Sequence, residues 1–285
     1  MWKPSGRVAI GMEGRTARKG DARYVFIGHV FIGHVLIGHQ AVPGMKWMLT
    51  PEEFALVWTR ETELERRPYP LDTLPRAIER TENPGAAPRM RHRYRTDPDL
   101  SAALMLCART DTTTVTLYGE CSNPAPRRIL AFAAVAQQRA GILVALPDAV
   151  SVMICPADQL GLELVEIIGS APPGRHAPMR EPQRAVLLPQ DPDTDPDADQ
   201  IVAPPDSADL AADHFRRKLR EPVDGRGFIT VTVEPANPLS PPTRHRTWLD
   251  FSGDGRYLLT TATDLTLTPM GDAELAEHLV RLARV

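Results

Sequence analysis

The segment Arg244–Val285 repeats an order of elements that occurs about 114 residues earlier in the chain. Each copy has runs rich in β-forming residues, followed by a helix with leucine or isoleucine on one face. A further helical segment precedes each copy. The sequence therefore predicts a fold built twice from an α-β-β-β-β-α unit. The matched segments are Val115–Gly119 with Ile229–Val233, Arg128–Gln137 with Arg244–Phe251, Gly141–Leu146 with Gly255–Thr261, Val150–Cys155 with Asp264–Thr268, and the leading helices Asp97–Thr110 with Asp206–Arg220.

Local signals place a hairpin and a helix in the second copy. Asp254-Gly255 between two β-rich runs favours a type I′ hairpin, which needs positive φ angles. Thr268 is expected to cap the last helix, with Pro269 in its first turn. The apolar stripe of this helix and its earlier counterpart are Leu275, Leu279 and Leu282, and Leu160, Leu164 and Ile167.

A further helix is predicted near the start of the folded region. Thr50 and Glu53 form a Thr-x-x-Glu capping box, and Pro51 suits the first helical turn. Phe54, Val57 and Trp58 give this helix an apolar face, and it should end before Pro68.

Composition limits the class of protein. With 285 residues and 42% apolar content the chain can bury a full core. A net charge of −3 gives no reason to expect nucleic acid or an anionic membrane as partner. No run reaches the ~20 apolar residues that membrane insertion needs. Cys107, Cys121 and Cys155 match no zinc spacing, and their odd number favours a reducing compartment, so we expect a cytoplasmic protein.

The first 44 residues do not match the period of a strand or a helix. They contain FIGHV, FIGHV and LIGHQ in succession, and a five-residue repeat fits neither element. His29, His34 and His39 as metal ligands are one interpretation, and a degenerate export signal is a second. We favour a third, in which residues 1–44 are a disordered or mis-assigned leader and Met45 is the start of the folded protein.

Two charged segments have a functional and a structural interpretation. The alternating arginines between Arg89 and Arg95 suit phosphate binding, but also a solvated approach to the next helix, which we favour. The alternating aspartates between Asp191 and Asp199 suggest calcium, yet the glycine and glutamate of an EF-hand loop are missing. An acidic, proline-rich linker over 170–205 is therefore expected, between a first half (45–169) and a second half (206–285).

Catalytic signatures were sought in the folded region. There is no phosphate loop, no nucleophile elbow and no His-Glu-x-x-His pattern. Asp250 and Asp254 flank the hairpin with Arg256 beside them, which is the one arrangement that suggests acid–base chemistry, although turn formation also explains it. His278 is expected to be exposed or at an interface. The sequence predicts no catalytic, cofactor-binding or metal-ligating residue and leaves the partner-binding residues undetermined.

The folded region resembles the EspG-type chaperones associated with ESX (type VII) secretion in actinobacteria, in a divergent branch. The resemblance rests on the opening LTPEEFALVW at Leu49–Trp58, followed by Tyr69-Pro70-Leu71. It also rests on Trp248-Leu249-Asp250, Asp254–Leu258, Thr268-Pro269 and the leucine-rich last helix, and it covers about 45–285.

The resemblance implies an α+β fold with quasi-two-fold halves and a mostly antiparallel central sheet flanked by helices. It also implies a non-enzymatic chaperone that covers the apolar tip of a helical secretion substrate, PE/PPE-like or WXG-type, until export. Two alternatives stay open. One is a generic interaction or regulatory scaffold, and the other is an enzyme that uses the carboxylates near Asp250 and Asp254.

Overall fold

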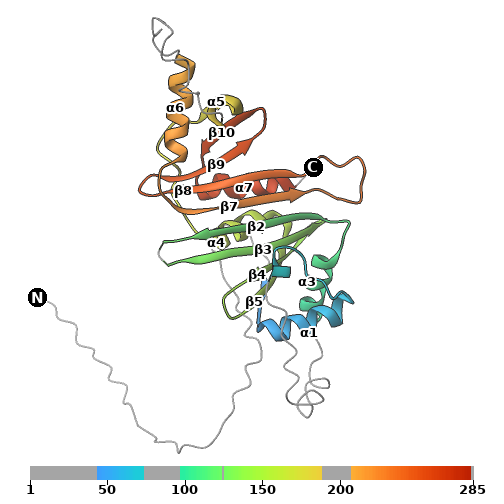
Figure 1. Cartoon of the computed structure of the whole chain (residues 1–285). Helices are drawn as coiled ribbons and strands as arrows, with labels where there is room; N and C mark the ends of the chain where they lie inside the picture. Colours follow the sequence, from blue (N-terminus) through green and yellow to red (C-terminus); the bar gives the residue numbers. More distant parts are fainter. Residues whose placement is uncertain (1–43, 74–96, 124, 188–206, 284–285) are drawn as a thin grey trace, which may run out of the picture.

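The computed structural model describes residues 44–73, 97–123, 125–187 and 207–283 (Figure 1). The FIGHV leader, the arginine-rich segment and the acidic stretch between Asp191 and Asp199 lie outside these ranges. The predictions for these three segments therefore stay predictions.

Within the described ranges, ten strands form one sheet in which every neighbouring pair is antiparallel. Its order is β1-β5-β4-β3-β2-β7-β8-β9-β10-β6. The strands are β1 (Met45–Leu49), β2 (Thr113–Cys121), β3 (Arg127–Ala136), β4 (Arg139–Ala145), β5 (Val150–Pro156), β6 (Met179–Pro182), β7 (Val223–Thr232), β8 (Arg244–Phe251), β9 (Gly255–Thr261) and β10 (Asp264–Pro269).

The helices lie between and after the strands. The described α-helices are α1 (Pro51–Thr62), α3 (Pro98–Ala108), α4 (Leu160–Ile168), α5 (Gln183–Leu187), α6 (Ser207–Leu219) and α7 (Asp272–Ala283), and the short 3₁₀ turns are η1 (Leu71–Thr73) and η2 (Ala157–Gln159). The order α3-β2-β3-β4-β5-α4 recurs as α6-β7-β8-β9-β10-α7, which confirms the predicted α+β duplication.

A pseudo-two-fold axis passes through the middle of the sheet. The strand order reads the same outward from the β2–β7 pair, and Thr116 faces Thr230 at its centre. Val115 pairs with Val231 and Leu117 with Ile229, so equivalent residues of the two copies exchange places across the axis.

The repeated unit is longer than the sequence predicted. Each half begins with an edge strand and a helix, β1-α1 in the first half and β6-α5 in the second. β6 and α5 lie within 170–187, a stretch that the sequence interpretation placed in the linker. β6 has only four residues and is followed by a helix of five, too short to give a periodic pattern.

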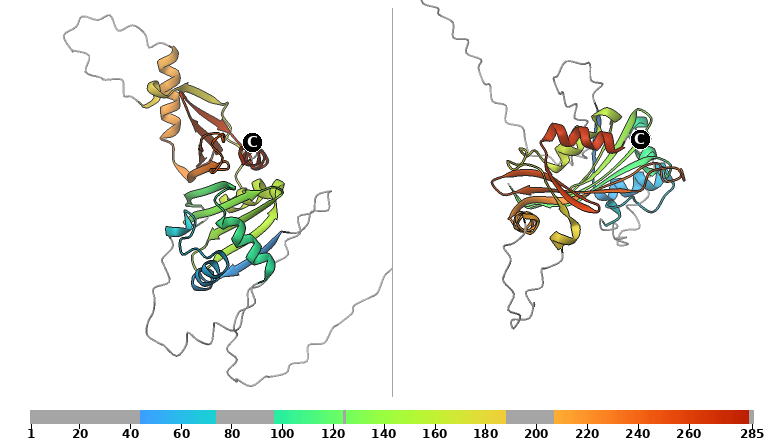
Figure 2. Two further views of the ribbon diagram at one scale, coloured as in Figure 1. Left: turned by 90° about the vertical axis from the view of Figure 1, so that its right-hand side faces the viewer. Right: turned by 90° about the horizontal axis from the view of Figure 1, so that it is seen from above.

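Helices cover both faces of the sheet (Figure 2). We call the face that carries α1, α3, α5 and α6 the front face, and the face that carries α4 and α7 the back face. On the back face α4 and α7 pack against each other and bury one core that draws on both halves, including Val115, Leu117, Leu164, Ile229, Trp248, Leu275 and Leu279. The predicted helix stripes are part of this core, with Ile167 packed at its margin.

The front face has two separate cores. One lies under α1 and α3 and contains Phe54, Trp58, Leu104, Phe132 and Val152. The other lies under α5 and α6 and contains Val186, Phe215, Phe251, Tyr257 and Leu267. The strands between these two cores, β2 and β7, therefore carry none of the described helices on their front face.

The capping box of α1 is confirmed. The Glu53 N–H donates to the Thr50 hydroxyl at 3.2 Å, and the Thr50 N–H donates to the Glu53 carboxylate at 2.9 Å. The helix ends earlier than expected, at Thr62, because Glu63 adopts the left-handed conformation with φ of 59°.

Two local predictions were wrong. Asp254-Gly255 do not form a type I′ turn, because Asp254 lacks the positive φ that such a turn needs at both central positions. The central residues of the β8–β9 turn are Ser252 and Gly253, and only Gly253 has positive φ (73°). Positive φ at the second central residue alone, with the Asp254 N–H donating to the Phe251 carbonyl, is the pattern of a type II turn. The last helix does not begin at Thr268, because β10 stays paired with β9 through Pro269 and α7 starts at Asp272.

Candidate partner-binding face

The front of β2 and β7 is the part of the sheet that the helices leave open. Strand alternation directs Val115 and Leu117 into the back core. The intervening residues therefore point to the front. On β2 these are Thr114, Thr116, Tyr118 and Glu120, and on β7 they are Arg226, Phe228, Thr230 and Thr232.

Three aromatic side chains are exposed across this opening. Tyr118 and Phe228 face each other on neighbouring strands and are 43% and 58% exposed. Tyr69, which is 50% exposed and lies just ahead of η1, stacks on Tyr118 with ring centroids 6.2 Å apart. Partial burial, followed by the neighbouring Tyr118 and Asp72, raises the pKa of Tyr69. We call Tyr69, Tyr118 and Phe228 the aromatic strip.

Polar groups border the aromatic strip along the same strands. On one side Glu120 and Arg226 form an exposed ion pair at 2.7 Å. On the other, the Thr230 hydroxyl lies 3.2 Å from Nδ1 of His245. An apolar centre with a polar rim is the usual anatomy of a protein–protein interface.

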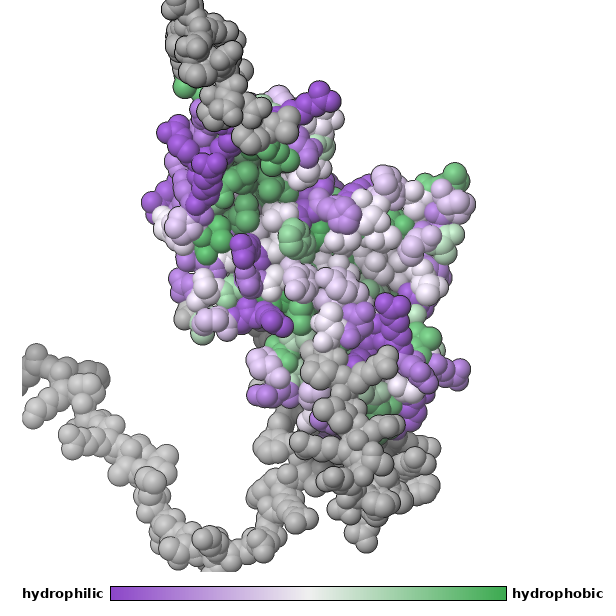
Figure 3. Space-filling model, viewed as in Figure 1, coloured by the Kyte–Doolittle hydropathy of each residue, from purple (hydrophilic) through white to green (hydrophobic). Residues whose placement is uncertain are grey.

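Further hydrophobic surface lies on the same side of the molecule, beside α6. Figure 3 shows this side of the molecule, with hydrophobic surface gathered beside α6 over β9 and β10. On the front of β8 and β9, Leu249 and Leu259 are only partly buried against the core under α6. Contiguous exposed apolar surface of this kind marks interaction sites on soluble proteins.

The carboxylates that suggested acid–base chemistry are held in ion pairs. Arg256 is 1% exposed, and its Nε and Nη2 donate to both oxygens of Asp250 at 2.7 and 3.0 Å. Nη1 donates to Asp272 at 3.1 Å, and Nη2 also donates to the Gly169 carbonyl at 2.7 Å. Arg256 therefore joins β8, β9, α7 and the end of α4.

Asp254 lies in a second network beside the first. It accepts hydrogen bonds from Lys218 Nζ at 2.6 Å, the Tyr257 hydroxyl at 2.8 Å and the Arg175 N–H at 2.8 Å. Burial alone would raise the pKa of Asp254, but these hydrogen bonds lower it to about 2. Lys218 also lies 4.2 Å from the centre of the Phe251 ring. Asp250 and Asp254 thus have separate cationic partners, an arrangement that ties the hairpin to its surroundings and leaves neither carboxylate free.

His278 is not the exposed side chain that one sequence interpretation expected, and its place at an interface stays a prediction. It is half-buried on α7, with Nδ1 3.1 Å from Arg281 and no hydrogen-bond partner for Nε2 within the described ranges. Burial, followed by the charges of Arg246 and Arg281, lowers the pKa of His278 to about 4.

No group of histidine, cysteine or carboxylate residues that could hold a metal ion occurs among residues the structure describes. Cys107, Cys121 and Cys155 are buried free thiols. The described helices include none long and apolar enough to cross a membrane.

Sequence reasoning missed the aromatic strip, although a signal for it was present. In β2 and β7 the inward positions are mostly buried, and each strand has one large aromatic residue at an outward position. An aromatic there has no core to fill. Tyr118 and Phe228 can be expected to face each other only if the two copies are assumed to be related by symmetry within one sheet.

These features define an internally duplicated α+β protein whose sheet is open at its centre on one face. The chain belongs to the EspG family, whose model matches residues 50–281.

Similarity to a solved structure agrees with the fold. The structure of the Mycobacterium tuberculosis type VII secretion system chaperone EspG5 in complex with a PE25–PPE41 dimer is similar to this chain with a TM-score of 0.52. The alignment covers 84% of this chain and 95% of that chain at 11% identity. No curated protein sequence matches the chain.

Proposed function

We propose that this protein is a non-enzymatic, cytoplasmic chaperone of type VII secretion that binds a helical substrate of the PE/PPE kind through the front of β2 and β7. Membership in the EspG family supports the chaperone role. The EspG5 complex supports the class of substrate, since that chaperone binds a PE–PPE pair. The observation that carries the assignment to this face is the aromatic strip, exposed between two helix-covered flanks.

The physical argument concerns the tip of a helical substrate. A helical pair with an apolar end aggregates unless that end is covered. Tyr118 and Phe228 lie side by side at the centre of the opening, where an apolar side chain of the substrate would be removed from water. Buried aromatic anchors surrounded by a polar rim carry most of the energy in interfaces of this type.

Charged residues at the edge of this face determine the orientation of a bound substrate. The Glu120–Arg226 pair is exposed to solvent and contributes little to the stability of the sheet by itself. A substrate with complementary charges can form ion pairs with Glu120 and Arg226 in place of the pair that they form with each other. Such contacts fix the position of the substrate on the face more than they raise its affinity.

The test has two stages. The full chain is used to recover its partner from the source cells, and the partner is then purified and its affinity measured by calorimetry. Phe228→Ser should weaken binding at least about 30-fold, the loss expected for a central aromatic anchor worth ~2 kcal/mol. Its matched control is Leu162→Ser, because Leu162 is 59% exposed, nearly as much as Phe228, but lies on α4 on the back face.

The proposal predicts a helical partner whose binding depends on Phe228 and not on Leu162. A partner that binds the Phe228→Ser variant as tightly as the wild type would move the site to another face. Recovery of only non-helical partners would contradict the chaperone role itself.

We also propose that the second half begins near β6, because β6 pairs with β10 and α5 packs on α6. The linker expected from the sequence would then be restricted to the region after Leu187.

A further inference from the structure

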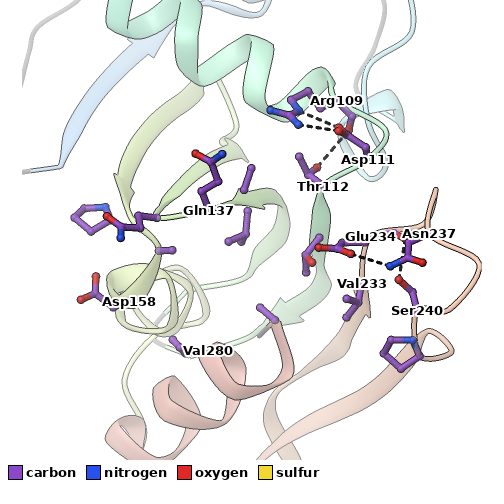
Figure 4. A pocket seen from close by; sticks show the side chains of 18 of the residues that line it. Arg109, Asp111, Thr112, Gln137, Asp158, Val233, Glu234, Asn237, Ser240 and Val280 are labelled. Carbon is purple, nitrogen blue, oxygen red and sulfur yellow. Dashed lines mark hydrogen bonds and ion pairs between the residues drawn. The ribbon is translucent and has the colours of Figure 1, made fainter. Parts of the chain in front are cut away.

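A groove opens at one end of the central strands, away from the aromatic strip. Its volume is about 950 Å³. It lies between the start of β2, the β3–β4 turn, η2, the β7–β8 loop and the end of α7 (Figure 4). In that view Asp158 and Val280 lie on one side, and Glu234, Asn237 and Ser240 lie on the other. We call this the end groove.

The pseudo-two-fold axis relates the end groove to a site that is already filled. The axis exchanges the β3–β4 turn with the β8–β9 turn, the end of α7 with the end of α4, and η2 with the start of α7. At the related position the chain leaves α4 and runs as Gly169–His176 along the start of β9. One end of the sheet therefore holds an extended segment, and no such segment lies at the equivalent end among the residues that the structure describes.

The filled site shows how such a segment is held. The Arg256 N–H donates to the Pro172 carbonyl at 2.7 Å, and the Gly174 N–H donates to the Arg256 carbonyl at 3.0 Å. At the start of α7 the Asp272 carboxylate accepts from the Ala171 N–H at 3.1 Å and from the Ser170 hydroxyl at 2.5 Å. Backbone pairing and the carboxylate at the start of α7 hold the segment, together with hydrogen bonds from Arg256 to Gly169, from Arg175 to Asp254 and from His176 to Tyr257.

The end groove has an equivalent carboxylate with no such contact. Asp158 lies in η2, directly before α4, as Asp272 lies at the start of α7. Within the described part of the chain Asp158 has no hydrogen-bond or ion-pair partner, whereas Asp272 binds Arg256 as well as the segment. The carbonyl of Gln138 accepts from the Ala157 N–H as that of Arg256 accepts from the Met270 N–H, so Gln138 is the counterpart of Arg256, and its side chain is uncharged.

The other residues that line the end groove favour a bound segment with many hydrogen-bond donors and small apolar side chains. Asp111 and Glu234 add negative charge, and the one arginine, Arg109, is paired with Asp111 at 2.7 Å. Between these polar groups the walls are formed by short apolar side chains, including Val135, Val233, Val280 and Ala283. A carboxylate without a partner binds N–H or hydroxyl donors, and more strongly when the donor is charged.

We propose that the end groove binds an extended, proline-containing segment of a protein partner, with N–H or hydroxyl donors on Asp158 and a basic residue near its end. This is the chemistry of Ser170–His176 in the filled site. The inference rests on the protein-binding role proposed above only for the nature of the partner. It concerns a second site, separate from the aromatic strip.

The test uses the full chain and a synthetic peptide with the sequence of the filled site, acetyl-SAPPGRH-amide. The chain's own copy occupies the related site, so the peptide should bind the end groove and shift NMR signals of residues such as Thr112 and Val280. Asp158→Asn should weaken binding about tenfold or more, as the loss of a charge-assisted contact does. Asp148→Asn, an exposed carboxylate in the β4–β5 turn, should leave the affinity unchanged.

A second variant tests whether the peptide occupies the end groove, because it fills the groove with a larger side chain. Ala157 lines the groove, and Ala157→Trp should abolish peptide binding while the melting temperature shows that the chain is folded. Absence of saturable binding, or equal affinity of the wild type and Asp158→Asn, would overturn the proposal. Phe228→Ser should bind the peptide normally, so failure of this inference and failure of the proposed function give different results.

Discussion

Thr116 on β2 and Thr230 on β7 face each other at the centre of the sheet, and each is the counterpart of the other in the duplicated sequence. The two halves therefore meet through a pair of equivalent central strands, not through a loop-rich boundary. Val115, Leu117 and Ile229 of these strands are fully buried in one core shared by both halves. The halves cannot separate without exposing this core.

We expect the two halves to unfold together. Leu117→Ala should lower the free energy of unfolding by about 2–5 kcal/mol, the usual loss for a buried leucine. The denaturant midpoints reported by Trp58 in the first half and Trp248 in the second should move by the same amount. Single-tryptophan variants observed by fluorescence give this comparison. A shift of the Trp58 transition alone would show that the halves unfold independently.

The glycines of the β8–β9 turn should differ in their tolerance of a side chain. At Gly255 φ is 145°, and an added Cβ would lie 2.6 Å from the carbonyl oxygens of Pro172 and Pro173. Gly255→Ala should therefore cost about 3 kcal/mol or more, from strain and displacement of the segment together. Gly253 has φ of 73° with nothing within 4 Å of an added Cβ, so Gly253→Ala should cost only about 1 kcal/mol. If the two variants lose the same stability in thermal unfolding, the segment Gly169–His176 does not pack against Gly255.

The features that could be predicted from the sequence are those that depend on residues close together in the chain. The capping box at Thr50 and the helix stripes through Leu164 and Leu279 depend on residues a few positions apart, and they were placed correctly. The duplication showed that the strands would form two equivalent sets. It did not show that the sets join through β2 and β7, because pairing between strands about a hundred residues apart leaves no local pattern. The aromatic strip was missed for the same reason, since Tyr69, Tyr118 and Phe228 meet only in the assembled sheet.

The stability of the protein should depend on the charge of Asp254 in acid. The folded-state pKa of Asp254 is about 2, below its ordinary value near 4, because the charged form is hydrogen-bonded to Lys218, Arg175 and Tyr257. A carboxylate whose folded-state pKa is lowered stabilises the folded protein at pH values above its unfolded-state pKa. This stabilisation is lost as the pH falls from about 4 to about 2. Asp254→Asn should therefore be less stable than the wild type at neutral pH, and the difference should shrink across this range. Urea unfolding at a series of pH values measures it, and a difference that stays constant with pH would contradict the assignment.

The three cysteines should be unreactive in the folded protein. Burial raises the pKa of the Cys107 thiol far above its ordinary value and that of Cys155 to about 12, with Cys121 also raised. Because the thiolate is the reactive species, an aromatic disulfide reagent at pH 8 should react with none of them until the chain unfolds. In urea all three should react. Rapid reaction of one thiol in native buffer would reveal local opening around that residue.

Trp248 should be energetically coupled to the two glycines beneath it. Its six-membered ring lies over Gly119 and Gly227, where an added Cβ would come within 2.6 Å and 2.1 Å of ring carbons. Gly227→Ala should therefore destabilise the protein by about 2–3 kcal/mol, because neither the ring nor the central strands can move freely. Trp248→Leu should cost a similar amount through the lost packing. In the double variant the two losses should not add, since the smaller side chain makes room for the new methyl group. Equilibrium unfolding of the four proteins measures this coupling, and strict additivity would mean that the ring does not rest on Gly227.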